Sequence, residues 1–222
     1  MLSSDISAPA RPDLNRVREA ALACTRCRLA DGRTQVVWAD GNLDADVLFI
    51  GEGPGFHEDQ QGKPFVGAAG QLLDRLLGEV GLDRSQVAIV NVVKCRPPGN
   101  RDPLPDEIEA CRPWLEAQIA HMRPSIIVTL GNFATKFILE EAVGITRARG
   151  RRYVRRDATV VPTYHPAAAL RGGRFGGNNP IDAIREDLRT VRHLLDEVRA
   201  ARQADSPREG AAEPQGEQLG LF

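Results

Sequence analysis

Four cysteines are the side chains of this sequence best suited to bind a metal centre. Cys24 and Cys27 form a Cys-x-x-Cys pair, and Cys95 and Cys111 follow much later in the chain. Four thiolates can complete the ligand set of a tetrahedral zinc ion or of an iron–sulfur cluster. Ordinary buried cysteines or two disulfides are the alternatives, but residues 1–12 lack the pattern of a secretory signal. The spacing therefore predicts a metal centre and leaves zinc and iron both open.

Other residues that could do chemistry lie in loops after apolar runs. The first loop contains Gly51-Glu-Gly-Pro-Gly55, His57-Glu-Asp59 and Gly62-Lys-Pro-Phe-Val-Gly67. Its glycines would let the backbone approach a ligand closely, but the loop has neither the P-loop nor the dinucleotide-binding spacing. Asn91 ends the second run and His165 follows the last one. A histidine beside other polar loops is a candidate for acid–base or hydrogen-bonding chemistry.

The elements that must position these loops alternate between strand-like and helix-like segments. Buried β-rich runs occupy residues 46–50, 87–93, 125–130 and 158–162, and helical patterns occupy 68–80, 106–121, 132–141 and 181–202. This alternation predicts an α/β fold, a three-layer α/β/α sandwich with a central four-stranded parallel sheet. Ligands of such sheets bind beyond the carboxyl ends of the strands. Pro113 predicts a kink, or a new helix that starts near Arg112.

The composition fits one globular domain. Of the 222 residues, 42% are hydrophobic and 27% are charged, which suits a single domain over residues 13–202 between disordered ends at 1–12 and 203–222. No apolar run is long enough to span a membrane, so we expect a cytoplasmic protein. The net charge of −1 gives no general attraction to nucleic acid, but six arginines lie within residues 147–156. Such a density suits phosphate contact, although a solvated hairpin would also explain it.

Several motifs together resemble a known family. They are Gly51-Glu-Gly-Pro-Gly55 with Glu58-Asp59, Gly62-Lys-Pro-Phe-Val-Gly-Ala-Ala-Gly-Gln-Leu-Leu73, Asn91-Val-Val-Lys-Cys-Arg-Pro-Pro98, Pro105-Asp-Glu with Cys111-x-x-Trp-Leu115, and His165-Pro166. Over residues 24–170 the chain resembles the family 4, thermostable-type uracil-DNA glycosylases, the iron–sulfur members of their superfamily. The resemblance implies a base excision repair enzyme that flips uracil out of DNA, hydrolyses its N-glycosidic bond and leaves an abasic site. It also implies that Cys24, Cys27, Cys95 and Cys111 hold a structural 4Fe-4S cluster.

The resemblance assigns roles to the loop residues. Phe65 would form the aromatic platform for uracil, and Asn91 would donate to its O4 and accept from its N3–H. His165 would donate to the uracil O2 as negative charge develops on the leaving base. Glu52 is the candidate for positioning the attacking water, although it could instead brace its loop. Gly53 would contact the substrate, at a position where another branch of the superfamily carries an aspartate. Glu58 and Asp59 are further candidates for positioning the water.

The DNA contacts follow from the same resemblance. Leu170 or Arg171 would fill the space that the flipped base leaves, and Arg149, Arg151 and Arg152 would contact phosphates, which makes binding sensitive to salt. A related branch traps uracil-DNA covalently through a histidine in the segment that corresponds to residues 97–105. Since this segment contains no histidine here, we expect turnover rather than a trapped adduct.

The end of the sequence resembles the short clamp-binding peptide of bacterial replication and repair proteins. Gln218, Leu219, Leu221 and Phe222 would bind the sliding clamp, presented by a flexible linker. A chance apolar end is the alternative.

Two other functions compete with the glycosylase. One is a non-catalytic iron–sulfur DNA-damage-binding protein recruited by the sliding clamp, and the other is a zinc-bound α/β protein that handles nucleotides. The presence of both Asn91 and His165 favours catalysis. We therefore expect a monomeric, nucleoid-associated enzyme that acts on uracil-containing DNA and does not bind membranes.

Overall fold

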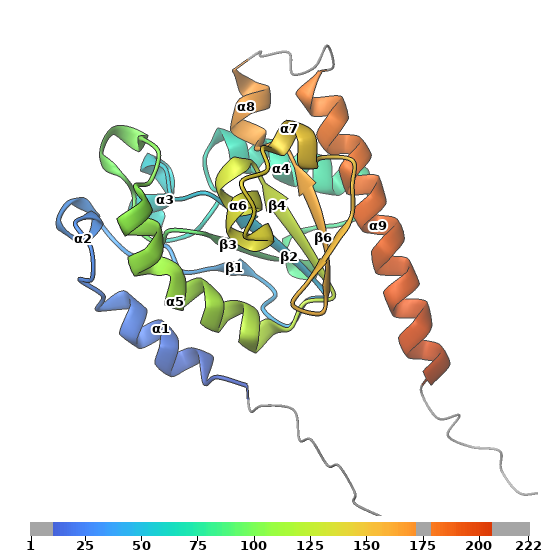
Figure 1. The fold of residues 1–222 in the computed structure, drawn as a ribbon, viewed down its shortest axis with the longest axis horizontal. Coiled ribbons are helices and arrows are strands. Elements are labelled where there is room, and N and C mark those ends of the chain that lie inside the picture. Colours follow the sequence, from blue (N-terminus) through green and yellow to red (C-terminus); the bar gives the residue numbers. More distant parts are fainter. Residues whose placement is uncertain (1–10, 172–178, 206–222) are drawn as a thin grey trace, which may run out of the picture.

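A mixed sheet forms the centre of the computed structural model, which describes residues 11–171 and 179–205 (Figure 1). In this part of the chain the sheet has six strands in the order β1-β3-β2-β4-β6-β5. Strands β3, β2, β4 and β6 run parallel, whereas β1 and β5 pair antiparallel at the two edges. The strand bounds are β1 Asp40–Gly41, β2 Val47–Gly51, β3 Ala88–Asn91, β4 Ile126–Leu130, β5 Tyr153–Arg155 and β6 Ala158–Thr163.

The predicted four-stranded parallel sheet is confirmed as the centre of this larger sheet, but the two edge strands were missed. β2, β3 and β4 are buried along their whole length, so they appear in the sequence as continuous apolar runs. β1 has only two residues, and β5 has three residues that remain partly or fully exposed. Short, solvated edge strands carry no such run, and backbone pairing alone defines them.

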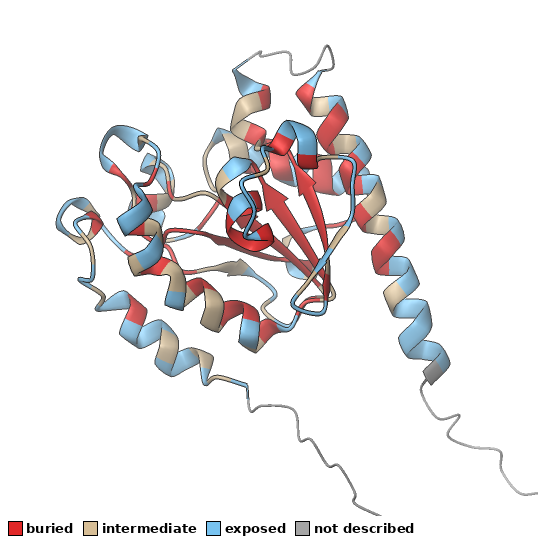
Figure 2. Cartoon of the chain, viewed as in Figure 1, coloured by how far each residue is buried: buried red, intermediate tan, exposed pale blue. Residues whose placement is uncertain are grey.

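Helices cover both faces of the sheet, which confirms the three-layer α/β/α prediction. The helices are α1 Leu14–Leu22, α2 Leu29–Gly32, α3 Phe56–Gln61, α4 Ala68–Glu79, α5 Pro105–Met122, α6 Asn132–Leu139, α7 Ile145–Ala148, α8 Pro166–Leu170 and α9 Pro180–Asp205, with short 3-10 helices at η1 Arg84–Gln86 and η2 Pro98–Asn100. Leucines of α4 and α9 pack on one face of the sheet, and apolar residues of α5 and α6 pack on the other. Figure 2 shows the central strands buried and the outer helix faces exposed.

Two helices differ from the predicted ranges. Of the two alternatives predicted at Pro113, a kink or a new helix that starts near Arg112, the second is wrong, because α5 continues through Pro113 as one helix. Buried side chains on both sides of the proline, Cys111 and Leu115 among them, anchor this helix and offset the lost backbone hydrogen bond. α9 extends to Asp205, beyond the predicted helix end at residue 202. The rest of the predicted tail and the predicted N-terminal segment up to residue 10 lie outside the described residues.

The helices in the described part of the chain are not of the membrane-spanning kind, because none combines the required length with the required apolar character.

Candidate active site

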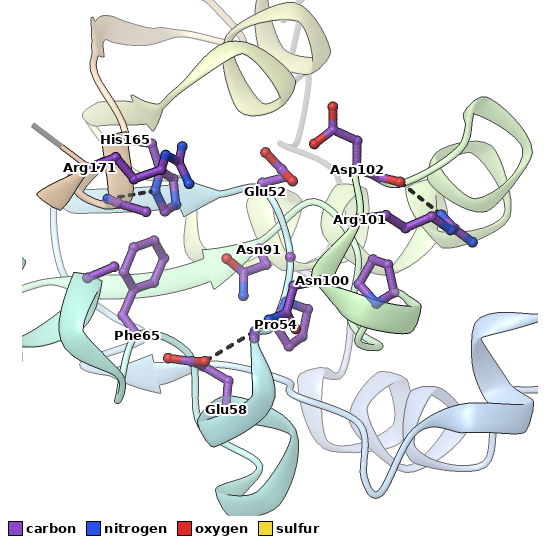
Figure 3. A pocket seen from close by; sticks show the side chains of 15 residues that line it. Glu52, Pro54, Glu58, Phe65, Asn91, Asn100, Arg101, Asp102, His165 and Arg171 are labelled. Atoms are coloured by element: carbon purple, nitrogen blue, oxygen red, sulfur yellow. Dashed lines mark hydrogen bonds between the residues drawn. The ribbon is translucent and has the colours of Figure 1, made fainter. Parts of the chain in front are cut away.

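A cavity of about 340 Å³ lies at the carboxyl ends of the parallel strands. Glu52 and Gly53 follow β2, Asn91 ends β3, and His165 follows β6, while Phe65 comes from the loop between α3 and α4. Figure 3 shows Asn91 between the Phe65 ring and the Glu52 carboxylate, with His165 and Arg171 along one side. The structure therefore brings all five predicted catalytic and substrate-binding residues to one cavity.

The Asn91 side chain is buried without a hydrogen-bond partner in the described structure. Only 2% of the residue is exposed, and neither its Nδ2 nor its Oδ1 has a partner. Buried polar groups are almost always paired, because an unpaired amide costs free energy. The backbone of Asn91 is nevertheless held firmly, since its carbonyl accepts a hydrogen bond from the buried Lys94 Nζ at 2.6 Å. Asn91 thus offers one donor and one acceptor to a ligand.

Two glycines allow the walls of the cavity to approach each other. A Cβ atom on Gly51 would lie 2.5 Å from Asn91 Oδ1 and 2.6 Å from the Phe65 ring, so Gly51 is packed between these side chains. A Cβ atom on Gly53 would lie 2.7 Å from the Val93 side chain. Glycine is therefore needed at both positions by the close packing of the site.

The Phe65 ring is held by its own backbone conformation. Phe65 has a φ of 54°, a conformation that side-chain-bearing residues rarely adopt. Arg84 stabilises it by donating hydrogen bonds to the Phe65 and Pro64 carbonyls, while Asp40 and Asp74 hold the Arg84 guanidinium. Gly70 is equally necessary, because a Cβ there would overlap the Phe65 carbonyl. Gly70 belongs to the motif of residues 62–73 described above, whereas no feature of the sequence connects Arg84 with this site.

His165 is a neutral hydrogen-bond donor in this environment. Its Nδ1 accepts a hydrogen bond from the backbone N–H of Ala167 at 3.1 Å, which assigns the ring proton to Nε2. Burial lowers the pKa of His165 to about 4, and the nearby Arg171 guanidinium acts in the same direction. The Phe65 ring lies next to the imidazole, with 5.5 Å between the two ring centres. His165 therefore carries an N–H into the cavity without a positive charge.

The Glu52 carboxylate lines the cavity, and its side chain has no hydrogen-bond partner among the described residues. Burial raises the pKa of Glu52 to about 7; the Asp102 carboxylate raises it further, and Arg171 opposes the shift. A carboxylate with this pKa can accept a proton near neutral pH. Asp102 also lines the cavity. Sequence reasoning missed it, because it lies in a loop far from any strand end.

Glu58 and Asp59, the other two candidates for positioning the water, hold loops in place through hydrogen bonds from the backbone. Glu58 accepts hydrogen bonds from the backbone N–H groups of Gly55, Val66 and Gly67, at 2.8 to 3.1 Å. Asp59 is buried, and both of its oxygens accept from the N–H of Thr34. Since these carboxylates are engaged with backbone donors, Glu52 is the stronger candidate for contact with a water molecule.

The arginines of residues 147–156 do not form one free cationic surface. Arg149 is largely buried, and it pairs with Asp187 at 2.7 Å and with Glu186 at 2.8 Å. Arg155 pairs with Glu141, and Arg156 pairs with Glu116. Arg151 and Arg152 are exposed and have no ion pair within the described residues. This geometry favours a structural role for Arg149 and leaves Arg151 and Arg152 available for phosphates.

Replacing Arg149 with alanine is expected to destabilise the protein. The substitution leaves the buried Asp187 carboxylate without its cation, a loss that typically costs about 3 kcal/mol. For a domain of this size the melting temperature should fall by about 6 °C or more. The matched control is Arg151→Ala, which should keep the melting temperature within about 1 °C and weaken DNA binding. Equal melting temperatures for the two variants would contradict the structural role.

Leu170 and Arg171 lie at the end of α8 beside the cavity. Leu170 is 49% exposed, which is unusual for a large apolar residue in this structure, and Arg171 lines the cavity edge. Both side chains are therefore available to a macromolecule that covers the cavity.

The four cysteines line a second, much smaller cavity. Cys24 and Cys27 lie between α1 and α2, Cys95 follows β3, and Cys111 lies on α5. None of them forms a disulfide. Arg33 donates to Cys95 Sγ at 3.5 Å, and the backbone N–H of Lys94 donates to Cys111 Sγ at 3.2 Å. Donors of this kind suit sulfurs that carry negative charge.

The cavity of the four cysteines is distinct from the candidate active site. No described residue lines both this cavity and the one that contains Asn91.

Comparisons with known proteins place the chain among DNA repair glycosylases. Residues 38–189 match the model of the uracil DNA glycosylase superfamily. A type-4 uracil-DNA glycosylase of Sulfurisphaera tokodaii is 46% identical over 190 residues, which cover 82% of this chain and 84% of that protein. One of Thermotoga maritima is 48% identical over 157 residues, covering 70% and 82% respectively. A type-5 uracil-DNA glycosylase of Pyrobaculum aerophilum is 31% identical over 61% of this chain.

Proposed function

The chain belongs to the uracil-DNA glycosylase superfamily as a type-4 member, and from this we infer that it excises uracil from DNA in base excision repair. The observation that carries the inference is the buried, unpaired amide of Asn91 in a cavity with Phe65 and His165. A base can reach such a cavity only when it leaves the duplex stack, so the substrate nucleotide must be flipped.

Uracil selection rests on Phe65 and Asn91. The Phe65 ring would support the face of the base, while Asn91 Nδ2 donates to O4 and Oδ1 accepts from N3–H. Cytosine presents the opposite pattern, with a donor at position 4 and an unprotonated N3. If cytosine bound, its amino group would face the Nδ2 donor and its N3 would face the Oδ1 acceptor of Asn91. Neither hydrogen bond could form, which costs free energy in a buried site. Gly53 would let the backbone lie against the substrate.

Cleavage rests on His165 and Glu52. The neutral His165 donates its Nε2–H to the uracil O2, where negative charge develops as the glycosidic bond breaks. Glu52 orients the attacking water and accepts its proton, and the water oxygen bonds to the sugar C1′ as uracil departs. Uracil leaves as its N1 anion and takes up the proton that Glu52 accepted, so the products are neutral uracil and an abasic site, and Glu52 is again a carboxylate.

The rate of excision is expected to depend on the protonation of Glu52. Its pKa is raised to about 7, so the group is protonated below that pH and cannot accept a proton from water. The value of kcat/KM should therefore fall as the pH decreases through about 7. Replacing Asp102 with asparagine should move the midpoint lower, because it removes a negative charge that favours the protonated form. Single-turnover rates between pH 5.5 and 9 test this, and an unchanged acidic limb in Glu52→Gln would contradict it.

The function itself is tested with a uracil-containing oligonucleotide. After incubation, alkali should cleave the strand at the uracil position, and an otherwise identical thymine oligonucleotide should stay intact. If the protein binds the uracil oligonucleotide but leaves no alkali-sensitive site, the non-catalytic damage-binding function would replace this proposal.

We propose that Cys24, Cys27, Cys95 and Cys111 hold a 4Fe-4S cluster. The four thiols facing one cavity, the donors to their sulfurs and the type-4 relatives support this assignment. Such a cluster would tie the segment before α2 to β3 and to α5, and glycosidic hydrolysis needs no electron transfer. The purified protein should contain about four iron atoms per chain and absorb visible light. A colourless protein with one zinc ion would contradict the assignment.

The contacts with larger partners are also proposals. Leu170 or Arg171 would enter the DNA stack beside the flipped base, and Arg151 and Arg152 would bind phosphates. Gln218, Leu219, Leu221 and Phe222, which lie outside the described residues, would bind the sliding clamp. Equal clamp affinity after deletion of residues 218–222 would exclude this partner. We expect the enzyme to work as a monomer beside the nucleoid in the cytoplasm.

A further inference from the structure

An exposed aromatic residue follows directly after a residue that lines the active-site cavity. Phe56 is 51% exposed and is the first residue of α3, directly after Gly55, which lines the cavity. His57 is also exposed, and its ring lies 5.5 Å from that of Phe56 with the planes nearly perpendicular. Single exposed apolar residues are common on proteins. The position of Phe56 next to the cavity is the feature that requires an explanation.

An arginine completes this site. The Arg96 guanidinium carbon lies 5.1 Å from the centre of the Phe56 ring, close enough for a cation–π contact. Arg96 Nε donates to Asn100 Oδ1 at 2.7 Å, and Asn100 lines the cavity. Arg96 forms no ion pair with an acidic residue in the described part of the chain, whereas Arg101 nearby is paired with Glu107. The Arg96 guanidinium is therefore available to pair with an anionic group of a ligand.

We propose that Phe56 and Arg96 bind the nucleotide next to the flipped uracil. The base of that nucleotide would stack on Phe56, and its phosphate would contact Arg96. An aromatic ring combined with a cation is the usual arrangement for binding single-stranded nucleic acid, because every base has a face that can stack. Asn100, the hydrogen-bond partner of Arg96, lies across the cavity from Arg171 (Figure 3), so one strand could contact both sides.

The proposal rests on the uracil-excision function and adds a strand preference to it. A base in a duplex is already stacked on its neighbours, so it gains less from Phe56 than an unstacked base does. The contribution of Phe56 should therefore be larger on single-stranded than on double-stranded substrate. Sequence-specific readout is not expected, since stacking tolerates any base.

The kinetic test compares Phe56→Ala with the wild-type protein on single-stranded and double-stranded uracil oligonucleotides. The alanine variant should raise KM on the single strand about fivefold or more, with a smaller change in kcat and a smaller rise on the duplex. Phe56→Trp should keep KM within about twofold, because indole also stacks. The matched control is Val154→Ala, since Val154 is 71% exposed on β5, away from the cavity. Unchanged KM in Phe56→Ala would overturn the proposal.

A spectroscopic test separates stacking from a general loss of structure. In a His165→Ala background, oligonucleotides carry 2-aminopurine at one of the two positions on either side of the uracil. Binding should quench the fluorescence at one of these positions, and Phe56→Ala should abolish the quenching while the melting temperature stays unchanged. Quenching that survives the substitution at every position would also overturn the proposal. If the wild-type protein excises no uracil, the proposed function fails instead, and the two failures are distinguishable.

Discussion

Replacing Asn91 with aspartate should lower kcat/KM for uracil excision by about 10³-fold or more. The substitution exchanges the Nδ2 donor for a second oxygen, which would oppose the uracil O4 inside a buried cavity. Loss of one hydrogen-bonding group in a buried binding site has a large effect on kcat/KM, because the group of the substrate that it paired with is then buried without a partner. Rates on single-stranded uracil oligonucleotides under single-turnover conditions measure this effect.

Two controls make the Asn91 result specific. Asn42→Asp introduces the same chemical change at an exposed position outside the cavity, and its activity should match the wild-type protein. Asn91→Ala should be inactive but at least as thermally stable as the wild-type protein, since the deleted amide has no partner in the described structure. An Asn91→Asp rate within about tenfold of wild type would show that this amide does not read the base.

Replacing His165 with alanine should lower kcat by about 10²- to 10³-fold with little change in KM. In the proposed mechanism its Nε2–H would interact more strongly with O2 in the transition state than in the bound substrate, because the negative charge develops only as the bond breaks. Loss of such an interaction reduces kcat and kcat/KM equally. His193→Ala on the exposed surface of α9 is the matched control and should retain full activity.

The pH dependence of the His165→Ala defect tests the charge of the donor. Since the pKa of His165 is lowered to about 4, the imidazole is neutral throughout pH 5 to 8. The ratio of wild-type to variant rates should therefore stay constant over this range. A ratio that decreases as the pH rises above 6 would indicate that a positively charged imidazole is the active form.

Much of the central sheet and most of the site could be predicted from sequence. Strands β2, β3 and β4 are buried on both faces, so their residues form continuous apolar runs. Parallel strands gather their carboxyl ends at one edge of the sheet, which places Glu52, Asn91 and His165 together once the strands are identified. The glycines of the motifs also mark positions where close packing leaves no room for a side chain, such as Gly51.

The sequence by itself thus determined the fold class, the family and the side chains that line the candidate active site. Only the tertiary structure decided their physical states, because these depend on groups from distant segments. Burial and Arg171 make His165 a neutral donor, Asp102 helps to raise the pKa of Glu52, and Arg84 holds the backbone of Phe65. The same reason hid the ion pairs of Arg149, since its carboxylate partners lie on α9, more than thirty residues away in the chain. Spacing along a chain does not reveal such pairings, because only folding brings the partners into contact.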